Sequence, residues 1–317
     1  MERLFSFSTW GIALVFMAIG SFGFGAETFR VGTYNVENYL LHSVGNRPEK
    51  TSESRAQVRA MIKALRADVL ALQEIGGPEA LESLRVDLHR DGVDYPYSDL
   101  ASGHDPYIQV AVLSRFPIAA SHRHTNDSFL LFGRRFFVSR GFLEVDLSIG
   151  SHYRFTLMCA HLKSRRAVPE ANEEELREQE AVLFREKIDA RLKSNPKANL
   201  VVLGDFNDTK ESQSIRAILG RGPAVLIDTR PGEGRFPRDG DNTLVADSDF
   251  QRPITWTHYY AKADSYSRID YLLLSRGMFH EWVKEQTCVL ARGGWGVASD
   301  HRPLVATFRA DDHGILP

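Results

Sequence analysis

Six stretches of the sequence place polar side chains beside an apolar run. They are TYNVEN with Asn35, VLALQE with Glu74, LMCAHLKS with His161 and Lys163, VVLGDFND with Asp205 and Asn207, RIDYLLLS with Asp270, and ASDHRPLV with Asp300 and His301. Polar groups at the edge of an apolar core are costly unless they are paired or used. Because these side chain types bind metal ions or phosphate, the stretches predict one site where strand ends converge.

Taken alone, most of these residues also have a structural explanation. Asn35 can cap a turn, His161 can be a hydrogen-bonded core histidine, and Asp270 can pair with the neighbouring arginine. Asp205 can close an Asx turn after its strand. For Glu74, metal binding is the favoured interpretation, because a lone carboxylate at the end of a buried strand needs a partner. For the others, the functional interpretation depends on all six stretches occurring in one chain.

The elements that must position these residues alternate along the chain. Apolar runs of strand type cover 29–36, 68–75, 106–118, 135–147, 153–164, 199–208, 267–275 and 302–308, and helical spacing covers 52–67, 77–92 and 169–195. Helices separate the strands in the first half and strands dominate later, which predicts an α/β fold of two face-to-face sheets with helices outside. The segment 220–253 is rich in Gly, Pro, Asp and Arg and predicts a long loop, and we find no linker between domains.

Composition and the N-terminus bear on partners and location. The 317 residues carry a formal net charge of −2, so polyanion binding requires a local basic patch rather than a basic chain. Residues 1–25 have the layout of a secretory signal peptide. This layout predicts a mature domain over 26–317 and a secreted or periplasmic location. The alternative is that the segment stays uncleaved as a membrane anchor. Cys159 and Cys288 lie in apolar runs, which favours two buried free thiols over a bridge.

The six motifs, in this order, resemble the endonuclease/exonuclease/phosphatase family, which has the deoxyribonuclease I-like fold. The resemblance runs from about Phe29 to Phe308. It implies a four-layer α/β sandwich that hydrolyses phosphoesters with a divalent metal. Glu74 and Asp300 would bind the metal, with Asn35 as an oxygen ligand or as an orienting residue. Such hard oxygen ligands favour magnesium, with manganese or calcium as alternatives.

The resemblance also implies catalytic roles. Protonated His161 would bind the phosphate, with Asp270 as its partner, and Asp300 would orient His301. Either His301 or Asp205 would be the general base. Asn207 would hold a phosphoryl oxygen or Asp205 itself. Arg140 matches the family's phosphate-facing arginine, and the cations Lys163, Arg165 and Arg166 would line the approach of a polyanion or form a solvated loop.

The family resemblance leaves the substrate open. A secreted nuclease acting on DNA or RNA is the first hypothesis, a phospholipid (sphingomyelinase-like) or small phosphoester hydrolase is the second, and an inactive binding module is the third. The Phe-rich segment NDSFLLFGRRFF is a buried strand in the favoured interpretation and a lipid-facing edge in the other. A monomer without stable membrane association after signal cleavage is expected.

Overall fold

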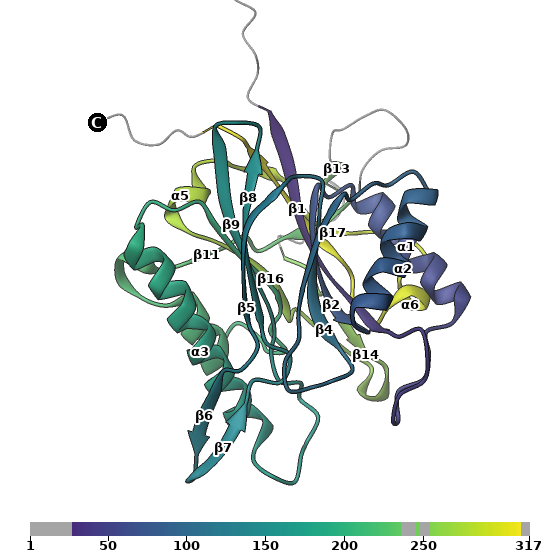
Figure 1. Ribbon diagram of the computed structural model, residues 1–317, viewed down its shortest axis with the longest axis vertical. Coiled ribbons are helices and arrows are strands. Elements are labelled where there is room, and N and C mark those ends of the chain that lie inside the picture. The colour runs from purple at the N-terminus through teal and green to yellow at the C-terminus, as the bar shows by residue number, and fades with distance from the viewer. Residues whose placement is uncertain (1–26, 236–244, 247–253, 312–317) are drawn as a thin grey trace, which may run out of the picture.

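The computed structural model describes residues 27–235, 245–246 and 254–311, and its centre is an eight-stranded mixed sheet (Figure 1). The strand order is β13-β12-β17-β18-β1-β2-β4-β3. The bounds are β1 (Thr28–Tyr39), β2 (Val69–Ile75), β3 (Tyr97–Ala101), β4 (Gln109–Ser114), β12 (Gly232–Arg235), β13 (Val245–Ala246), β17 (Trp282–Leu290) and β18 (Leu304–Arg309). β1 is parallel to β2 and antiparallel to β18, so the start of β18 lies at the same edge as the ends of β1 and β2.

A six-stranded sheet packs against the first, in the order β11-β16-β10-β9-β8-β5. Its strands are β5 (Ile118–His124), β8 (Phe142–Ile149), β9 (Tyr153–His161), β10 (Leu200–Asp205), β11 (Ile227–Asp228) and β16 (Asp270–Leu274). β9 and β10 are parallel, and β16 runs antiparallel to β10. The ends of β9 and β10 and the start of β16 therefore share one edge, as in the first sheet.

Apolar side chains fill the space between the sheets and the space under the helices. Val31, Val69 and Val112 of the first sheet meet Val145, Leu157 and Val201 of the second in the central core. The outer face of the first sheet is covered by α1 (Ser52–Leu65), α2 (Pro78–Arg90) and α6 (Trp295–Ala298), and that of the second by α3 (Glu173–Ser194) and α4 (Gln213–Leu219). Figure 1 shows these layers with α1, α2 and α6 on one side and α3 on the other. The predicted four-layer α/β sandwich is confirmed.

Three predicted elements differ from the structure in ways that have a clear physical reason. The helix expected from residue 169 begins at Glu173, because the Asn172 side chain accepts hydrogen bonds from the first helical amides and caps it. The strand expected over 106–118 is two strands, β4 and β5, in different sheets, separated near Pro117, which has no amide hydrogen. The strand expected over 135–147 is also divided, at Gly141 with φ +68°.

The favoured interpretation of the Phe-rich segment is wrong. Instead of a buried strand, it forms a separate hairpin of β6 (Ser128–Leu131) and β7 (Arg134–Phe137), outside both large sheets. Figure 1 shows the hairpin projecting at the lower end of the molecule. Leu130 and Phe132 are 64% and 77% exposed. Apolar composition alone did not distinguish an exposed hairpin from a core strand.

The remaining predictions about segments have mixed outcomes. The loop expected over 220–253 contains, in its described part, a 3-10 turn (Gly222–Ala224) and the sheet strands β11, β12 and β13. The predicted signal peptide lies outside the described residues. Within the described part of the chain, no helix is long and apolar enough to cross a membrane. Cys159 and Cys288 are free and buried, as expected, and burial raises the pKa of each thiol to about 12.

Candidate active site

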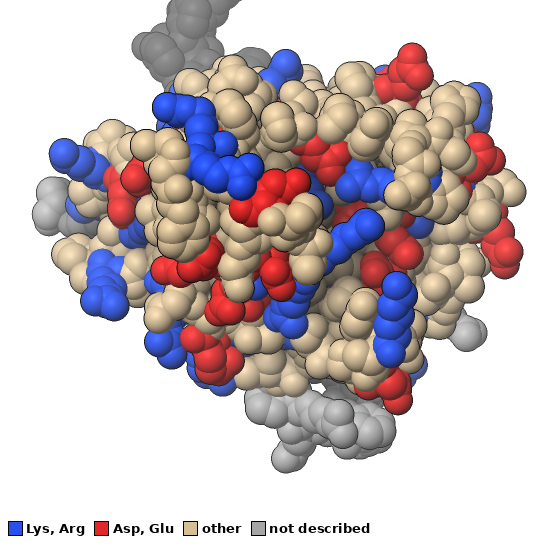
Figure 2. Space-filling model, turned by 90° about the horizontal axis from the view of Figure 1, so that it is seen from below, with Lys and Arg blue, Asp and Glu red and all other residues tan. Residues whose placement is uncertain are grey.

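The predicted site residues gather at the shared edge of the two sheets. Asp205 ends β10 and lies in register with His161 at the end of β9 and with Asp270 at the start of β16. Asn35 and Glu74 lie near the ends of β1 and β2, and His301 precedes β18. This edge is at the lower end of the molecule in Figure 1. Figure 2 views that end and shows Asp and Glu side chains interleaved with Lys and Arg across the face.

Gly204 explains the glycine of the GDFND motif. It has φ +136°, and a Cβ atom at this position would lie 2.0 Å from the backbone oxygen of Ala160 on β9. Only glycine combines that backbone conformation with that close approach. Gly204 thereby lets β9 and β10 bring His161 and Asp205 together.

His301 is oriented by Asp270. Its Nδ1 lies 2.9 Å from the Asp270 carboxylate, and both side chains are buried. The backbone N–H of Asp270 donates to the Thr257 hydroxyl, which holds the start of β16. Two role predictions are therefore wrong. Asp270 pairs with His301 rather than His161, and Asp300, whose nearer oxygen is 3.8 Å from His301 Nε2, does not orient the ring by a hydrogen bond.

Asp205 is the centre of the cluster. Its Oδ2 accepts from the side-chain amides of Asn35 at 3.0 Å and Asn207 at 3.3 Å. The same oxygen is 3.4 Å from His161 Nε2 and 3.7 Å from His301 Nε2. Burial raises the pKa of Asp205 to about 6; the charge of His301 opposes this shift and that of Asp270 adds to it. A buried carboxylate with that pKa can exchange a proton near neutral pH.

The two histidines of the site, His161 and His301, differ in charge. Burial lowers the pKa of His301, but the carboxylates of Asp270 and Asp205 outweigh it and hold the pKa well above its usual value. Burial and the nearby cations Arg140 and His301 hold the pKa of His161 well below its usual value. His161 is therefore neutral, contrary to the prediction, and His301 is the imidazolium of the site.

Glu74 is held in place by two amides. Its Oε1 accepts from Asn35 Nδ2 at 3.2 Å, and its Oε2 accepts from the backbone N–H of Asn38 at 2.8 Å. Asn35 Oδ1 faces the backbone N–H of Glu37 at 2.9 Å. Of the two roles considered for Asn35, this geometry corresponds to the orienting residue. Glu74 has φ +67°, which is uncommon for a residue with a side chain and is typical of a functional position.

Among the residues that the structure describes, two groups of side chains could hold a cation. His258, Asp300 and His301 form one group, and Asp205, Asp270 and His301 form the other, with ligand atoms within 4.8 Å of each other in each group. Asn38 Oδ1, beside Glu74, is buried and has no hydrogen-bond partner among the described residues, so it is a spare oxygen donor at this edge. Both groups include His301, whose imidazolium has no lone pair for a cation, so the carboxylates and the Asn38 amide oxygen are the donors that fit a divalent metal.

Two residues of this site, His258 and Glu37, were not identified from the sequence. His258 Nε2 lies 3.6 Å from Asp300, and its ring is 4.6 Å from that of His301. Burial raises the pKa of Asp300, but His258 and His301 lower it more, and the net pKa is below its usual value. Glu37 is the second; burial and the Asp300 charge raise its pKa to about 7. Glu37 was visible in TYNVEN, whereas His258 reaches the site through a backbone bridge to His301 that no sequence motif indicates.

The predicted basic residues divide into three kinds. Buried Arg140 donates to the Leu162 carbonyl at 3.1 Å, and its Nε has no partner among the described residues. The Lys163 ammonium donates to the carbonyls of Ser164 and Arg166 within its own loop. Arg165 instead donates to the Asn207 carbonyl at 3.0 Å. Arg165 is therefore the cation of this loop that touches the site.

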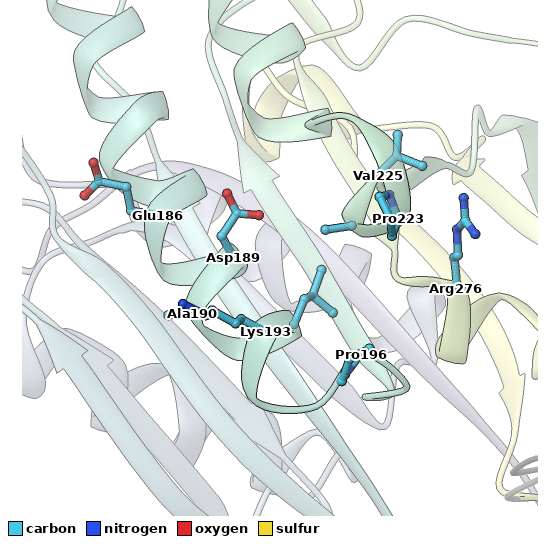
Figure 3. Close-up of a pocket in the computed structure, with 10 residues that line it drawn as sticks. Glu186, Asp189, Ala190, Lys193, Pro196, Pro223, Val225 and Arg276 are labelled. Carbon is cyan, nitrogen blue, oxygen red and sulfur yellow. The ribbon is translucent and has the colours of Figure 1, made fainter.

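A separate pocket of about 440 Å³ lies between α3 and the turn that follows α4 (Figure 3). Leu192, Pro196 and Val225 give it an apolar lining, and Lys193 and Arg276 are also in its wall. None of the predicted site residues lines it. The chemistry described above therefore belongs to the strand edge and not to this pocket.

The chain is similar to known proteins in its sequence profile and in its fold. The sequence profile of the Endonuclease/Exonuclease/phosphatase family matches residues 32–301. A search of curated proteins found no match. The fold is similar to the human Nocturnin catalytic domain, with 17% identity, TM-score 0.59, and coverage of 89% of this chain and 94% of that one.

Two further solved structures have the same fold. Sphingomyelinase C from Streptomyces griseocarneus is 19% identical with TM-score 0.58, and the match covers 90% of this chain and 100% of that one. Truncated TDP2 from Caenorhabditis elegans is 15% identical with TM-score 0.54, covering 89% and 97%. Similarity at this level establishes the architecture but does not identify the substrate, which has to be argued from the residues of the site.

Proposed function

The chain belongs to the Endonuclease/Exonuclease/phosphatase family and is a phosphoester hydrolase, and from that premise we propose that it is a secreted nuclease that hydrolyses DNA or RNA with magnesium. The observation that carries the proposal is the buried series of side chains Asp270, His301 and Asp205, which the Asn35 side-chain amide joins to Glu74. It combines a proton acceptor, a fixed cation and a carboxylate for a metal. These are the groups that water attack on a phosphodiester needs.

Asp205 is the proposed general base. It takes the proton of the attacking water, because its pKa near 6 leaves it ionised at neutral pH. His301 already carries its proton and so cannot accept another. Both amide hydrogens of Asn207 are engaged, with Asp205 and the Leu162 carbonyl, so Asn207 positions the base and does not bind a phosphoryl oxygen.

His301 and Arg140 are the proposed phosphate contacts. As water forms its bond to phosphorus, negative charge grows on the phosphoryl oxygens and the leaving oxygen, and fixed cations stabilise it. The His301 imidazolium is held in one orientation by Asp270, so little reorganisation is needed. Glu74 and Asp300 would hold the metal, which supplies Lewis-acid polarisation of the phosphate when bound.

Nucleic acid is preferred as substrate because exposed cations lie beside the site. Arg165 joins the site through Asn207, and Arg166 next to it is exposed. A chain of net charge −2 needs such a local patch to bind a polyanion. A phospholipid is the second candidate, and the exposed apolar hairpin β6–β7 is the feature that keeps it in the test.

The experiment is a substrate panel with and without chelator. Purified protein is incubated with single- and double-stranded DNA, RNA, sphingomyelin and inositol phosphates in magnesium, manganese or calcium. We expect nucleic acid to be cleaved, and chelator to stop cleavage. Release of phosphocholine with all nucleic acids left intact would replace the nuclease proposal by the lipid one.

A further inference from the structure

The residue type at the tip of the β6–β7 hairpin is explained neither by burial nor by the preferences of its turn. Its two-residue turn is Phe132–Gly133, with φ +50° and +73°, and Leu131 pairs with Arg134 on either side. Turns of this kind favour Asn-Gly or Gly-Gly, because a side chain is strained at positive φ. Phe132 bears that strain while its ring is 77% exposed, so it gains little from burial. Strain without local compensation is a reason to look for a function.

The hairpin also carries uncompensated positive charge. Arg134 and Arg135 follow the turn and are exposed. Among the described residues, neither arginine makes an ion pair; Arg135 donates to the Ser128 hydroxyl, and Arg134 to a backbone carbonyl. An exposed aromatic ring beside two such arginines combines the two contacts that nucleic acid offers, a base face and phosphates.

A physical link joins the hairpin to the catalytic site. Arg134 Nη1 lies 3.4 Å from the backbone oxygen of Glu170, in the loop that precedes α3. The same loop carries Arg165 and Arg166, and Arg165 contacts the backbone of Asn207 in the site. Exposed arginines therefore lie beside the catalytic residues, on this loop and on the hairpin. One of them, Arg165, also lies 3.5 Å from the Asp208 carboxylate.

We propose that this loop and the β6–β7 hairpin form an extended binding track for a nucleic acid strand. Arg165, Arg166, Arg134 and Arg135 would contact successive phosphates, and Phe132 would stack on a base at the far end. The proposal rests on the proposed nuclease function and specifies how the substrate is held. Exposed arginines that extend from the catalytic site to a hairpin beyond it match an extended polyanion, which is why we favour a strand over a membrane surface.

The track is tested by binding. The affinity of a 20-nucleotide fluorescein-labelled single-stranded DNA is measured by anisotropy, in chelator so that no cleavage occurs, for the wild type, Phe132→Asn and Arg134→Gln/Arg135→Gln. Asn suits the positive φ of the turn, so Phe132→Asn removes the ring without straining the hairpin. We expect its affinity to fall at least about fivefold, the lower end of what one lost base-stacking contact costs.

The arginine variant has a distinct signature. The slope of log affinity against log salt concentration should become shallower by about 1.4, the value for two lost phosphate contacts on a single strand. Phe279→Asn is the matched control, because Phe279 is also exposed but lies on α5 (Arg276–Phe279), at the opposite end of the molecule in Figure 1. It should bind as the wild type does.

Unchanged affinity and salt slope in both track variants would overturn the inference. So would Phe132→Asn losing binding to anionic phosphatidylglycerol vesicles while it keeps DNA affinity, which would make the hairpin a lipid-docking element. Wild-type protein that hydrolyses bis(4-nitrophenyl) phosphate but binds no DNA or RNA would overturn the nuclease proposal itself. Equal DNA binding by wild type and variants would overturn only the track.

Discussion

At the scale of single residues, the site is a set of charges fixed by burial. Asp205, Asp270 and His301 are all nearly inaccessible, and the neighbouring charges change the pKa of Asp205 and of His301. The motifs identified these residues from the sequence, but not their pairing. His161 and His301 both lie beside Asp205, so the sequence could not show which histidine Asp270 orients. The hydrogen bond to His301 Nδ1 depends on how β16 and the segment before β18 meet in space.

The Asp270–His301 pair gives the first prediction. Asp270→Asn should lower the pKa of His301 toward its usual value, because it removes the largest charge that raises that pKa. The kcat should fall by about 10²–10⁴-fold with a smaller change in KM. NMR titration of the His301 ring checks the pKa. A His301 pKa that is unchanged in Asp270→Asn would contradict the assignment of Asp270 as the orienting residue.

The raised pKa of Asp205 gives a second prediction, for stability against pH. The pKa of Asp205 is about 6 in the folded protein, which is above its value in the unfolded chain. Ionisation of Asp205 in the fold therefore lowers the free energy of unfolding as the pH rises from about 4 to 6. Asp205→Asn cannot ionise. In chelator, the melting temperature of Asp205→Asn relative to wild type should therefore increase between pH 4 and pH 7.

The opposite change in melting temperature would show that burial does not raise the pKa of Asp205. If the Asp205→Asn melting temperature falls relative to wild type over that range, then the ionised carboxylate is stabilised by its amide and histidine neighbours. Asp205 would then have a low pKa, and its role as a base near neutral pH would lose its physical reason.

At the scale of elements, strand direction does most of the positioning. Four strands of the site, β1, β2, β9 and β10, end at the shared edge, and β16 and β18 start there, which motif order and apolar runs predicted well. Elements that depend on tertiary context were predicted poorly. The β6–β7 hairpin has the apolar composition of a core strand, and its Phe-Gly turn lacks the usual turn residues. β14 (His258–Tyr260) reaches the site only because it bridges to His301.

Gly204 gives a prediction at this scale. Gly204→Ala should destabilise the protein by about 3 kcal/mol or more, since the new Cβ meets the Ala160 carbonyl and the strained φ is disfavoured. Urea unfolding followed by circular dichroism measures the change. Gly296→Ala is the control, because nothing lies within 4 Å of a Cβ there. Equal stability of Gly204→Ala and Gly296→Ala would show that the β9–β10 approach is not as tight as described.

At the scale of the whole molecule, the sandwich brings two sheets to one edge so that each contributes part of the site. Glu74 belongs to the eight-stranded sheet and Asp205 to the six-stranded sheet, and Asn35 hydrogen-bonds to both carboxylates. A metal bound at this edge would tie the sheets together. The fold class was predictable, because it follows from the alternation of elements and the family motifs. The substrate was not, because exposed loops and hairpins determine it.

Metal binding gives a prediction for the folded molecule. Adding magnesium at 100 times its dissociation constant to chelated protein should raise the free energy of unfolding by about 2.7 kcal/mol, because only the folded state assembles the site. The melting temperature with and without magnesium measures this. The shift should be lost in Glu74→Gln and retained in Glu285→Gln, a carboxylate exposed on β17. A shift that survives in Glu74→Gln would place the metal elsewhere.

The central claim is that this edge hydrolyses nucleic acid with Asp205 as the base. The most direct test is the single-turnover cleavage rate of a 20-nucleotide single-stranded DNA or RNA in magnesium, for wild type and Asp205→Asn at equal substrate occupancy. We predict cleavage by the wild type and a rate lower by about 10²–10⁴-fold in the variant, the range expected for loss of a general base. A wild type that cleaves neither strand, or a variant that cleaves as fast as the wild type, would contradict the claim.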